Sequence, residues 1–361
     1  MPLEREHMNR KIPFSEEELR VVEIGPGFLG SPGNPVYNTP VTPKENVMAM
    51  FWEKDPFWLS MPGEMGYFAA PFYNDYLGRG GPDGTVDAFG IEWEWVPSAG
   101  GSIVHPGDPL VKDANELKDK IHFPDLDQID WKAEVEKSSK PDLRFSPQMS
   151  LINGFWFERL ISFMDFASAA AALFDEDQQD AVKTFFREST EFACRLIDKL
   201  IYYFPFLDGF NIHDDWGAQK NPFFSMEIAN EFFVPHMRDL TDHIHSKGRY
   251  ATLHSCGNNE KRIQCYIDGG FDQWDPQPMN DTQALYEAYG DKIILSVIPD
   301  QFDPETTSEE EQRARARAHV DRFCRPGKVS VLGYYAASML TPAFKEEVYT
   351  YSRKKFAGQL Q

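Results

Sequence analysis

The sequence has few cysteines and no large cluster of basic residues. Only four cysteines occur among 361 residues, and they are too widely spaced for the disulfide framework of a small secreted protein. With 36 Lys and Arg against 57 Asp and Glu, the formal net charge is −21. Nucleic-acid binders present a basic face to the phosphates, whereas the one basic patch here, at residues 313–317, alternates with alanine beside glutamates. We therefore expect no nucleic-acid partner.

Long apolar runs are also missing. No stretch approaches the length that would cross a membrane, and the charged start Met1–Glu6 lacks the apolar core of a signal peptide. The composition, 42% apolar and 26% charged, is ordinary for a soluble globular enzyme. We expect a cytoplasmic protein with no membrane partner. Its reduced cysteines would serve as buried thiols, metal ligands or nucleophiles.

The chain divides into an N-terminal extension and one large domain. Glycine and proline interrupt any periodicity in residues 1–40, and this glycine-rich stretch lacks the spacing of a phosphate-binding loop. Thr42 followed by Pro43 is typical of a helix start. We therefore expect an irregular extension over residues 1–40 and a catalytic domain over residues 41–361.

Strands and helices alternate regularly in the second half of the chain. Before that half, the pattern predicts strands at 57–59 and 151–155, a strand or hairpin arm at 87–96, and helices at 108–120, 156–174 and 176–203. The regular part predicts strands at 209–213, 250–254, 271–274, 292–297 and 328–332, each followed by a helix. The helix at 225–247 should be kinked by Pro235. Five strand–helix units with short loops indicate parallel βα repeats.

An open sheet and a closed barrel both fit this alternation. Polar residues follow nearly every strand, namely Asn153, His213, Asp214, Asp215, His254, Cys256, Gln273, Asp275, Gln277, Asp300, Tyr334 and Tyr335. A ring of polar groups at the carboxyl ends of the strands is how a TIM barrel builds its site. The predicted fold class is therefore α/β, a TIM (β/α)8 barrel with an irregular N-terminal extension.

The sharpest chemical feature is the pair His254-x-Cys256 at the end of the strand at 250–254. Residues at i and i+2 of a strand point to the same face, and an imidazole beside a thiol suits zinc. The simpler alternative is a hydrogen-bonded histidine beside a core cysteine. Zinc needs at least three protein ligands, and Cys324 lies before the strand at 328–332, at its wrong end. The other candidates for a third ligand are the carboxylates of Asp214, Asp215 and Glu64.

A second cluster, His213-Asp214-Asp215-Trp216, follows the strand at 209–213. Two adjacent carboxylates at a strand end can bind a metal, or one can keep a raised pKa and act as an acid. The alternative is a solvated turn in which one of the two aspartates caps the next segment.

The order of several short stretches is informative. They are Thr42–Val47, Asp87–Trp93, His105–Leu110, Gly154 with Phe157–Arg159, Asp214–Gln219 and His254–Asn258. In this order they resemble the uroporphyrinogen decarboxylase superfamily, and specifically its cobalamin-dependent methyltransferase branch with O-demethylase-like members. The resemblance extends over residues 42 to about 345.

This resemblance implies a TIM barrel with a zinc site. In the methyltransferase branch a His-x-Cys pair and a later cysteine bind zinc, and His254 and Cys256 match the pair. The later cysteine should fall near the end of the strand at 328–332, where this chain has Gly333-Tyr334-Tyr335. Either another residue, Cys324 or a carboxylate, replaces that cysteine, or the metal is lost.

A second difference between this chain and the superfamily indicates the substrate class. The true decarboxylases carry an arginine-rich segment after the first strand, but here Ser60–Met65 contains no arginine. The carboxylates of a polyanion would be desolvated and unpaired there. A neutral or aromatic substrate fits this segment better.

The sequence therefore predicts a zinc-assisted methyltransferase that moves a methyl group from a small methylated substrate, such as a methoxylated aromatic, to a corrinoid protein. The catalytic candidates are Asp214, Asp215 and Glu64. The substrate-binding candidates are Met61, Tyr67, Phe155, Glu158, Trp216, Gln277 and Tyr334. A decarboxylase that works without metal and a non-catalytic barrel that binds a corrinoid or another ligand remain alternatives, and homodimer formation stays open.

Overall fold

The computed structural model describes residues 11–25, 35–73, 77–79, 84–97, 101–105, 107 and 109–360. The chain forms two compact units, which are described separately. Unit 1 consists of Met1–Gly66, Asp142–Ser146 and Asp272–Gln361, and unit 2 consists of Tyr67–Pro141 and Pro147–Phe271. Among the described residues, no helix has both the length and the apolar character needed to cross a membrane.

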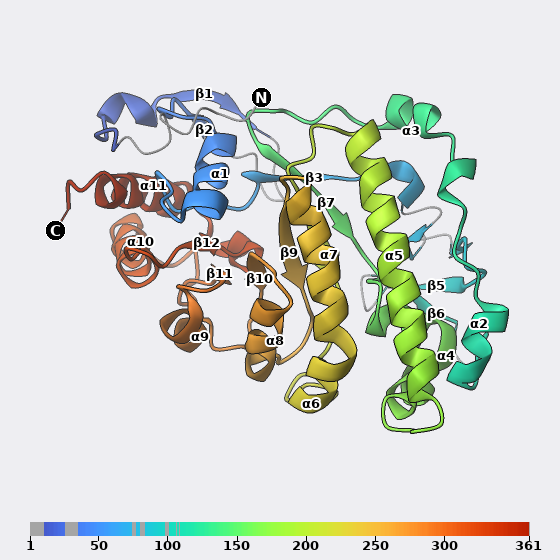
Figure 1. Cartoon of the computed structure of the whole chain (residues 1–361). Helices are drawn as coiled ribbons and strands as arrows, with labels where there is room; N and C mark the ends of the chain where they lie inside the picture. Colours follow the sequence, from blue (N-terminus) through green and yellow to red (C-terminus); the bar gives the residue numbers. More distant parts are fainter. Residues whose placement is uncertain are drawn as a thin grey trace. The chain divides into compact units, whose positions relative to one another are not determined.

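Unit 2 is built on parallel strands and long helices (Figure 1). Its elements are β4 (Thr85–Val86), β5 (Glu92–Val96), β6 (Gly101–Val104), α2 (Leu117–Lys120), α3 (Trp131–Lys137), β7 (Ser146–Leu151), α4 (Phe157–Ala172), α5 (Gln179–Tyr203), β8 (Gly209–His213), α6 (Met226–Ile228), α7 (Val234–Ser246), β9 (Tyr250–His254) and α8 (Ile263–Asp268). The strands β7, β8 and β9 pair in parallel, and β4, β5 and β6 form a separate antiparallel sheet. Helices α5 and α7 lie side by side.

One face of β7, β8 and β9 carries a row of polar side chains. Ser150 donates to the Oδ1 of Asn211 over 3.0 Å, and the Nδ2 of Asn211 donates to the Oγ1 of Thr252 over 2.8 Å. Because side chains at i and i+2 of a strand share a face, His213 and His254 continue this row at the strand ends. The hydrogen bonds satisfy polar groups inside the sheet, and the parallel register of β8 and β9 sets the two histidines opposite each other.

Unit 1 contains the second set of parallel strands. Its elements are β1 (Val21–Ile24), β2 (Pro35–Tyr37), α1 (Pro43–Glu53), β10 (Gln273–Asp275), α9 (Thr282–Tyr289), β11 (Ile294–Val297), α10 (Glu309–Phe323), β12 (Ser330–Leu332) and α11 (Pro342–Phe356). The short strand β3 (Met65–Phe68) crosses the chain boundary between the units. β10, β11 and β12 pair in parallel, and Ser60 forms a parallel bridge with Val331.

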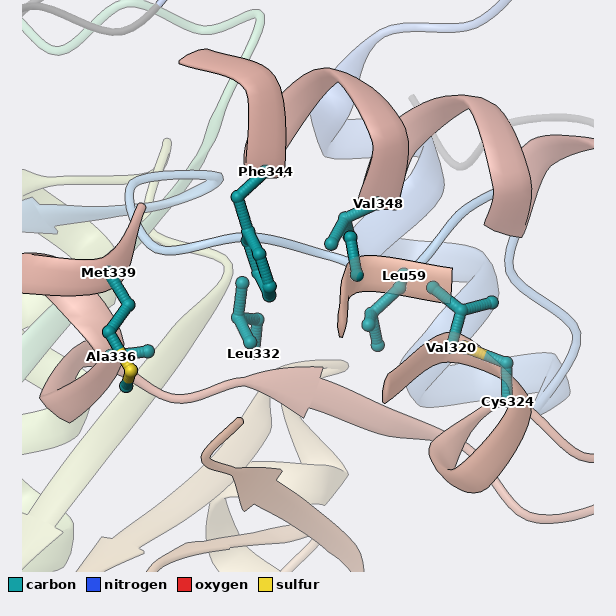
Figure 2. Packing of buried hydrophobic residues seen from close by; sticks show 9 residues of the cluster. Leu59, Val320, Cys324, Leu332, Ala336, Met339, Phe344 and Val348 are labelled. Carbon is teal, nitrogen blue, oxygen red and sulfur yellow. The ribbon is translucent and has the colours of Figure 1, made fainter. Parts of the chain in front are cut away.

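The core of unit 1 lies around β12, α10 and α11 (Figure 2). Leu332 on β12 packs in one cluster with Val320 on α10 and Phe344 on α11, all fully or almost fully buried. Cys324 belongs to the same apolar cluster. Helix α10 begins at its cap Ser308, whose side chain accepts a hydrogen bond from the amide of Glu311.

The predicted alternation of strands and helices is confirmed from β8 onward. The predicted kink near Pro235 is a π-helical turn, Ala229–Phe233, directly before α7. Three earlier predictions were wrong. No strand forms at 57–59, where the chain makes only the isolated bridge at Ser60. The other two were wrong in position. The strand predicted at 151–155 is β7, which ends at Leu151, and of the helix predicted at 108–120 only a 3-10 turn and α2 are formed, while residue 108 lies outside the described residues.

The described part of the N-terminal extension is ordered against unit 1. It forms a 3-10 turn (Glu16–Leu19) and the antiparallel pair β1–β2. Phe14 packs with Phe57, Trp58 and Tyr349 in one buried cluster. Residues 1–10 and 26–34 of the predicted extension lie outside the described residues. The division into an extension and one catalytic domain stays a prediction.

Candidate metal centre

Two histidines meet at the carboxyl ends of β8 and β9. The strands pair in parallel with His213 opposite His254. Each histidine is the last residue of its strand. Their rings stack with centroids 4.5 Å apart and planes 28° apart. The residues two positions further along, Asp215 and Cys256, bring a carboxylate and a thiol to the same place.

The side chains of His213, Asp215 and His254 form a group that could hold a metal ion. One ligand atom from each lies within 4.8 Å of the other two. Two imidazoles and one carboxylate match a donor set of catalytic zinc sites, which leave a coordination position open for water or substrate. The same set also suits other divalent transition metals. The residues present therefore fit a zinc ion without a cysteine ligand.

Cys256 lies directly beside this group. Its Sγ is 3.2 Å from the Nε2 of His254, and its backbone amide donates to the Oδ1 of Asp215 over 2.6 Å. Burial and the Asp215 carboxylate raise the pKa of the Cys256 thiol well above its ordinary value. Burial and the neighbouring His213 lower the pKa of His254 to about 3, so its imidazole is neutral at physiological pH, as a metal ligand must be.

Glu158, at the start of α4, holds His213 in place. The Nδ1 of His213 donates to the Oε2 of Glu158 over 2.9 Å, and Arg79 forms an ion pair with the other carboxylate oxygen. Burial would raise the pKa of Glu158, but the charges of Arg79 and His213 outweigh it and lower the pKa to about 2. Glu158 in turn raises the pKa of His213 against the effect of its burial. When His213 is neutral, the ionised acceptor on Nδ1 leaves Nε2 as the lone-pair nitrogen, the tautomer found in carboxylate–histidine–metal arrangements.

Asp214 points away from this donor set and binds backbone amides instead. It is fully buried and accepts hydrogen bonds from the amides of Phe157 and Glu158 and from the indole nitrogen of Trp216. Burial and the charge of Glu158 raise its pKa to about 7. A Cβ at Gly154 would come within 2.6 Å of the Asp214 carboxylate, so the glycine makes room for it. Asp214 thus ties the start of α4 to the end of β8.

The loops after β8 and β9 touch each other through glycines. The amide of Asn258 donates to the carbonyl of Ala218 over 2.8 Å. Gly257 has a φ of +94°, and a Cβ added there would lie 2.2 Å from the backbone of Gly217. This close approach keeps Asp215 and Cys256 on neighbouring loops within hydrogen-bonding distance.

Gly257→Ala is expected to destabilise unit 2 around the candidate metal centre. The positive φ alone costs about 1–2 kcal/mol for a residue with a Cβ. The contact adds to this penalty, because the atoms it meets belong to the backbone of Gly217 and cannot rotate aside. We expect the free energy of unfolding, measured by urea denaturation, to fall by more than about 2 kcal/mol.

Gly248→Ala is the matched control for this variant. Gly248 also has a positive φ, +68°, but no atom lies within 4 Å of an added Cβ. It should therefore lose only the conformational contribution to the free energy of unfolding, about 1–2 kcal/mol. Equal losses for the two variants would contradict the importance of the contact between the loops.

The other substrate-binding candidates of unit 2 differ in exposure. Tyr67 is 56% exposed, whereas Phe155 and Trp216 are buried. Trp216 packs against Phe224, Phe233 and Tyr266. Of these three candidates, Tyr67 offers the most surface to a ligand.

The remaining candidates belong to unit 1. Glu64 is buried and accepts a 2.7 Å hydrogen bond from the indole of Trp58. Burial raises its pKa to about 7, although this bond and those from Ser60 and Asn46 oppose the rise. Met61 packs against the apolar core, Tyr334 lies against Tyr335 with ring centroids 4.0 Å apart, and Gln277 follows β10.

Cys324 lies in an apolar environment. It is buried in the apolar cluster with Val320 and Val348 (Figure 2). Burial raises the pKa of its thiol to about 12. For the third ligand, the geometry within unit 2 therefore favours the carboxylate of Asp215 over Cys324.

Sequence reasoning missed two residues, His213 as a ligand candidate and Arg79. For His213 a signal existed, because His213-x-Asp215 repeats the spacing of His254-x-Cys256 at the end of the preceding strand. For Arg79 there was none. It reaches Glu158 over a separation of 79 residues and lies in no recognisable pattern.

Solved structures show the fold of the chain. A methyltransferase from Methanosarcina mazei superposes with a TM-score of 0.57 and 15% sequence identity, over 88% of this chain and 99% of that one. A xylose isomerase-like TIM barrel protein from Mycobacterium smegmatis, in complex with magnesium, gives a TM-score of 0.29 and 12% identity over 64% of this chain and 89% of that one, too low to support an argument. No family model and no curated protein matches the chain. The first superposition concerns the fold alone and confirms the predicted α/β class, that of TIM barrels.

Proposed function

We propose that this chain is a methyltransferase that moves a methyl group from a small methylated substrate to a corrinoid carried by a partner protein. The observation that carries the proposal is the convergence of His213, Asp215 and His254 at the ends of two adjacent parallel strands. The shared fold with a methyltransferase supports the same class of activity. The corrinoid partner rests on the family resemblance of the sequence.

The residues of unit 2 would hold and orient a zinc ion at this place. His213, Asp215 and His254 would be the ligands, with Cys256 beside them. When bound, zinc would act as a Lewis acid on the ether oxygen of the methyl donor. This help matters because a phenol has a pKa of about 10, which makes a phenolate a poor leaving group.

Glu158 and Asp214 would act by holding the proposed ligands in place, and Asp215 would do so in addition to binding the metal. Glu158 keeps His213 in the tautomer that presents Nε2. Asp215 accepts from the amide of Cys256, so the carboxylate and the loop after β9 hold each other. Asp214 fixes the start of α4 and with it the position of Glu158. These contacts pre-organise the donor atoms, which favours a defined geometry at the reacting centre.

A metal analysis combined with a turnover assay tests the proposal. The purified chain should contain about one zinc per polypeptide. Supplied with a methoxylated aromatic and a corrinoid reduced to cobalt(I), it should form methylcobalamin or methylated corrinoid protein and release the phenol. Formation of coproporphyrinogen from uroporphyrinogen, without methyl transfer, would replace the proposal by the decarboxylase. Corrinoid binding without turnover of any methyl donor would replace it by the non-catalytic barrel.

A further inference from the structure

A buried histidine of unit 1 lacks hydrogen-bond partners among the described residues. His319 lies on α10 and is only 3% exposed, and neither its Nδ1 nor its Nε2 has a partner there. A neutral imidazole carries one N–H donor and one acceptor nitrogen, and leaving both buried and unsatisfied costs free energy. An apolar side chain would fill the same place without this cost. Packing alone therefore does not explain a histidine at this position.

His319 lies on the side of α10 that faces the core of unit 1. Its neighbour Val320 packs in one cluster with Leu332 of β12 and Phe344 of α11 (Figure 2). The imidazole itself packs against the ring of Phe323, one helical turn further along, with ring centroids 4.8 Å apart. A charge that forms on His319 therefore acts directly on the packing of α10 against the core.

Two charged side chains of unit 1 also act on His319. They are Arg322 on the same helix and Asp300 in the segment after β11. Arg322 donates to both carboxylate oxygens of Asp300, over 3.0 and 3.1 Å. This carboxylate is already engaged by a guanidinium, so an imidazolium at His319 would have to compete with Arg322 for it.

The pKa of His319 gives the direction of the pH dependence. Burial lowers this pKa from 6.5 to about 3, and the charge of Arg322 adds to the effect while that of Asp300 opposes it. Between these two pH values an unpacked His319 binds a proton and the packed one does not. The packed state therefore keeps its stability above pH 6.5 and loses it as the pH falls from 6.5 toward 3.

We propose that His319 is an acid-sensitive switch, which lets α10 pack against β12 and α11 near neutral pH and releases the helix in acid. A buried imidazolium without a counter-charge of its own is strongly unfavourable. Movement of α10 away from the core hydrates the imidazolium and removes this penalty. The switch involves neither a metal nor a corrinoid, so it is independent of the function proposed above.

Cys324 reports the release of α10. It is the C-cap residue of the helix and is 2% exposed within the apolar cluster, so a thiol reagent reaches it when the helix moves away. The probe is 4,4′-dithiodipyridine, which reacts with thiols in acid as well as at neutral pH. Mass spectrometry gives the rate at Cys324, which is divided by the rate of N-acetylcysteine at the same pH. This relative rate should rise about 30-fold from about pH 7.5 to about pH 5.

Two variants that cannot be protonated in this range test the role of His319. His319→Met is apolar and His319→Gln is polar, and both should lose the rise at Cys324. His122→Gln is the matched control, because His122 is an exposed histidine of unit 2, and it should keep the rise. Cys265, which is buried in unit 2, is the internal reference and should respond to pH equally in the wild type and in all variants.

Three outcomes would overturn the proposal. The first is a wild-type chain whose Cys324 reacts no faster in acid, and the second is a rise that persists without His319. If His319→Met does not fold, His319→Gln alone decides this point. The third is a variant in which the response of Cys265 falls together with that of Cys324, because His319 would then control the stability of the whole chain and not the packing of α10.

Discussion

His254→Ala should remove the bound zinc and lower the rate of methyl transfer by at least about a hundredfold. The variant takes away one of the three ligands proposed above, and a zinc site with two protein ligands would no longer be stable. Even the loss of a residue that only orients a ligand lowers metal affinity by about 10–100-fold. The measurements are zinc content after dialysis against a weak chelator and the rate of methylcorrinoid formation.

The matched control is His243→Ala. His243 lies on α7 of the same unit and pairs with Asp198 over 3.0 Å at the surface, so it should keep both zinc and activity. Cys256→Ala separates the two ligand sets that the site allows. If His213, Asp215 and His254 are the ligands, this variant keeps its zinc, whereas a His-x-Cys site would lose it. Full zinc content in a folded His254→Ala chain would contradict the metal centre altogether.

The second half of the fold could be predicted because the secondary structure that each segment favours locally is the one that the whole fold requires there. In β8 and β9 apolar residues alternate with the polar ones of the row, each strand is followed by a helix, and glycine or proline marks the turns. The strand β7 was harder, because Ser146–Leu151 is half polar and its half-buried Gln148 and Ser150 belong to a hydrogen-bonded row. Polar residues whose hydrogen bonds are made inside a sheet give the strand a composition that is typical of a loop, so the sequence alone does not identify it as a strand.

The location of the candidate metal centre could be predicted from the sequence, but the full set of its residues could not. Strand ends located His254 and Asp215, because carboxyl ends of parallel strands meet at one edge. The register that sets His213 opposite His254 exists only once the strands pair. Glu158 was predicted as a substrate-binding residue, but its bond to His213 joins residues 55 positions apart. Such long-range contacts leave no periodic trace in a single sequence.

Glu18→Ala is expected to lower the free energy of unfolding of unit 1 by about 3–5 kcal/mol. Glu18 lies in the N-terminal extension, is buried, and pairs with Arg353 on α11 through two hydrogen bonds of 3.0 Å. It also accepts a 2.6 Å bond from the hydroxyl of Tyr349. Removing the carboxylate leaves the buried guanidinium without a counter-charge, which is far worse than losing an exposed ion pair. Urea denaturation followed by tryptophan fluorescence measures the change.

Glu16→Ala is the control for this variant, because Glu16 is 79% exposed and only 3.9 Å from Lys354. It should change stability by less than about 0.5 kcal/mol. The double variant Glu18→Leu with Arg353→Met asks whether the charge or the contact matters, since well-packed apolar residues can replace a buried ion pair at little cost. Recovery of most of the lost stability would show that the unpaired charge of Arg353 causes the defect. A loss as small as that of Glu16→Ala would mean that the extension does not hold α11, and the buried pair would then contribute little to the fold.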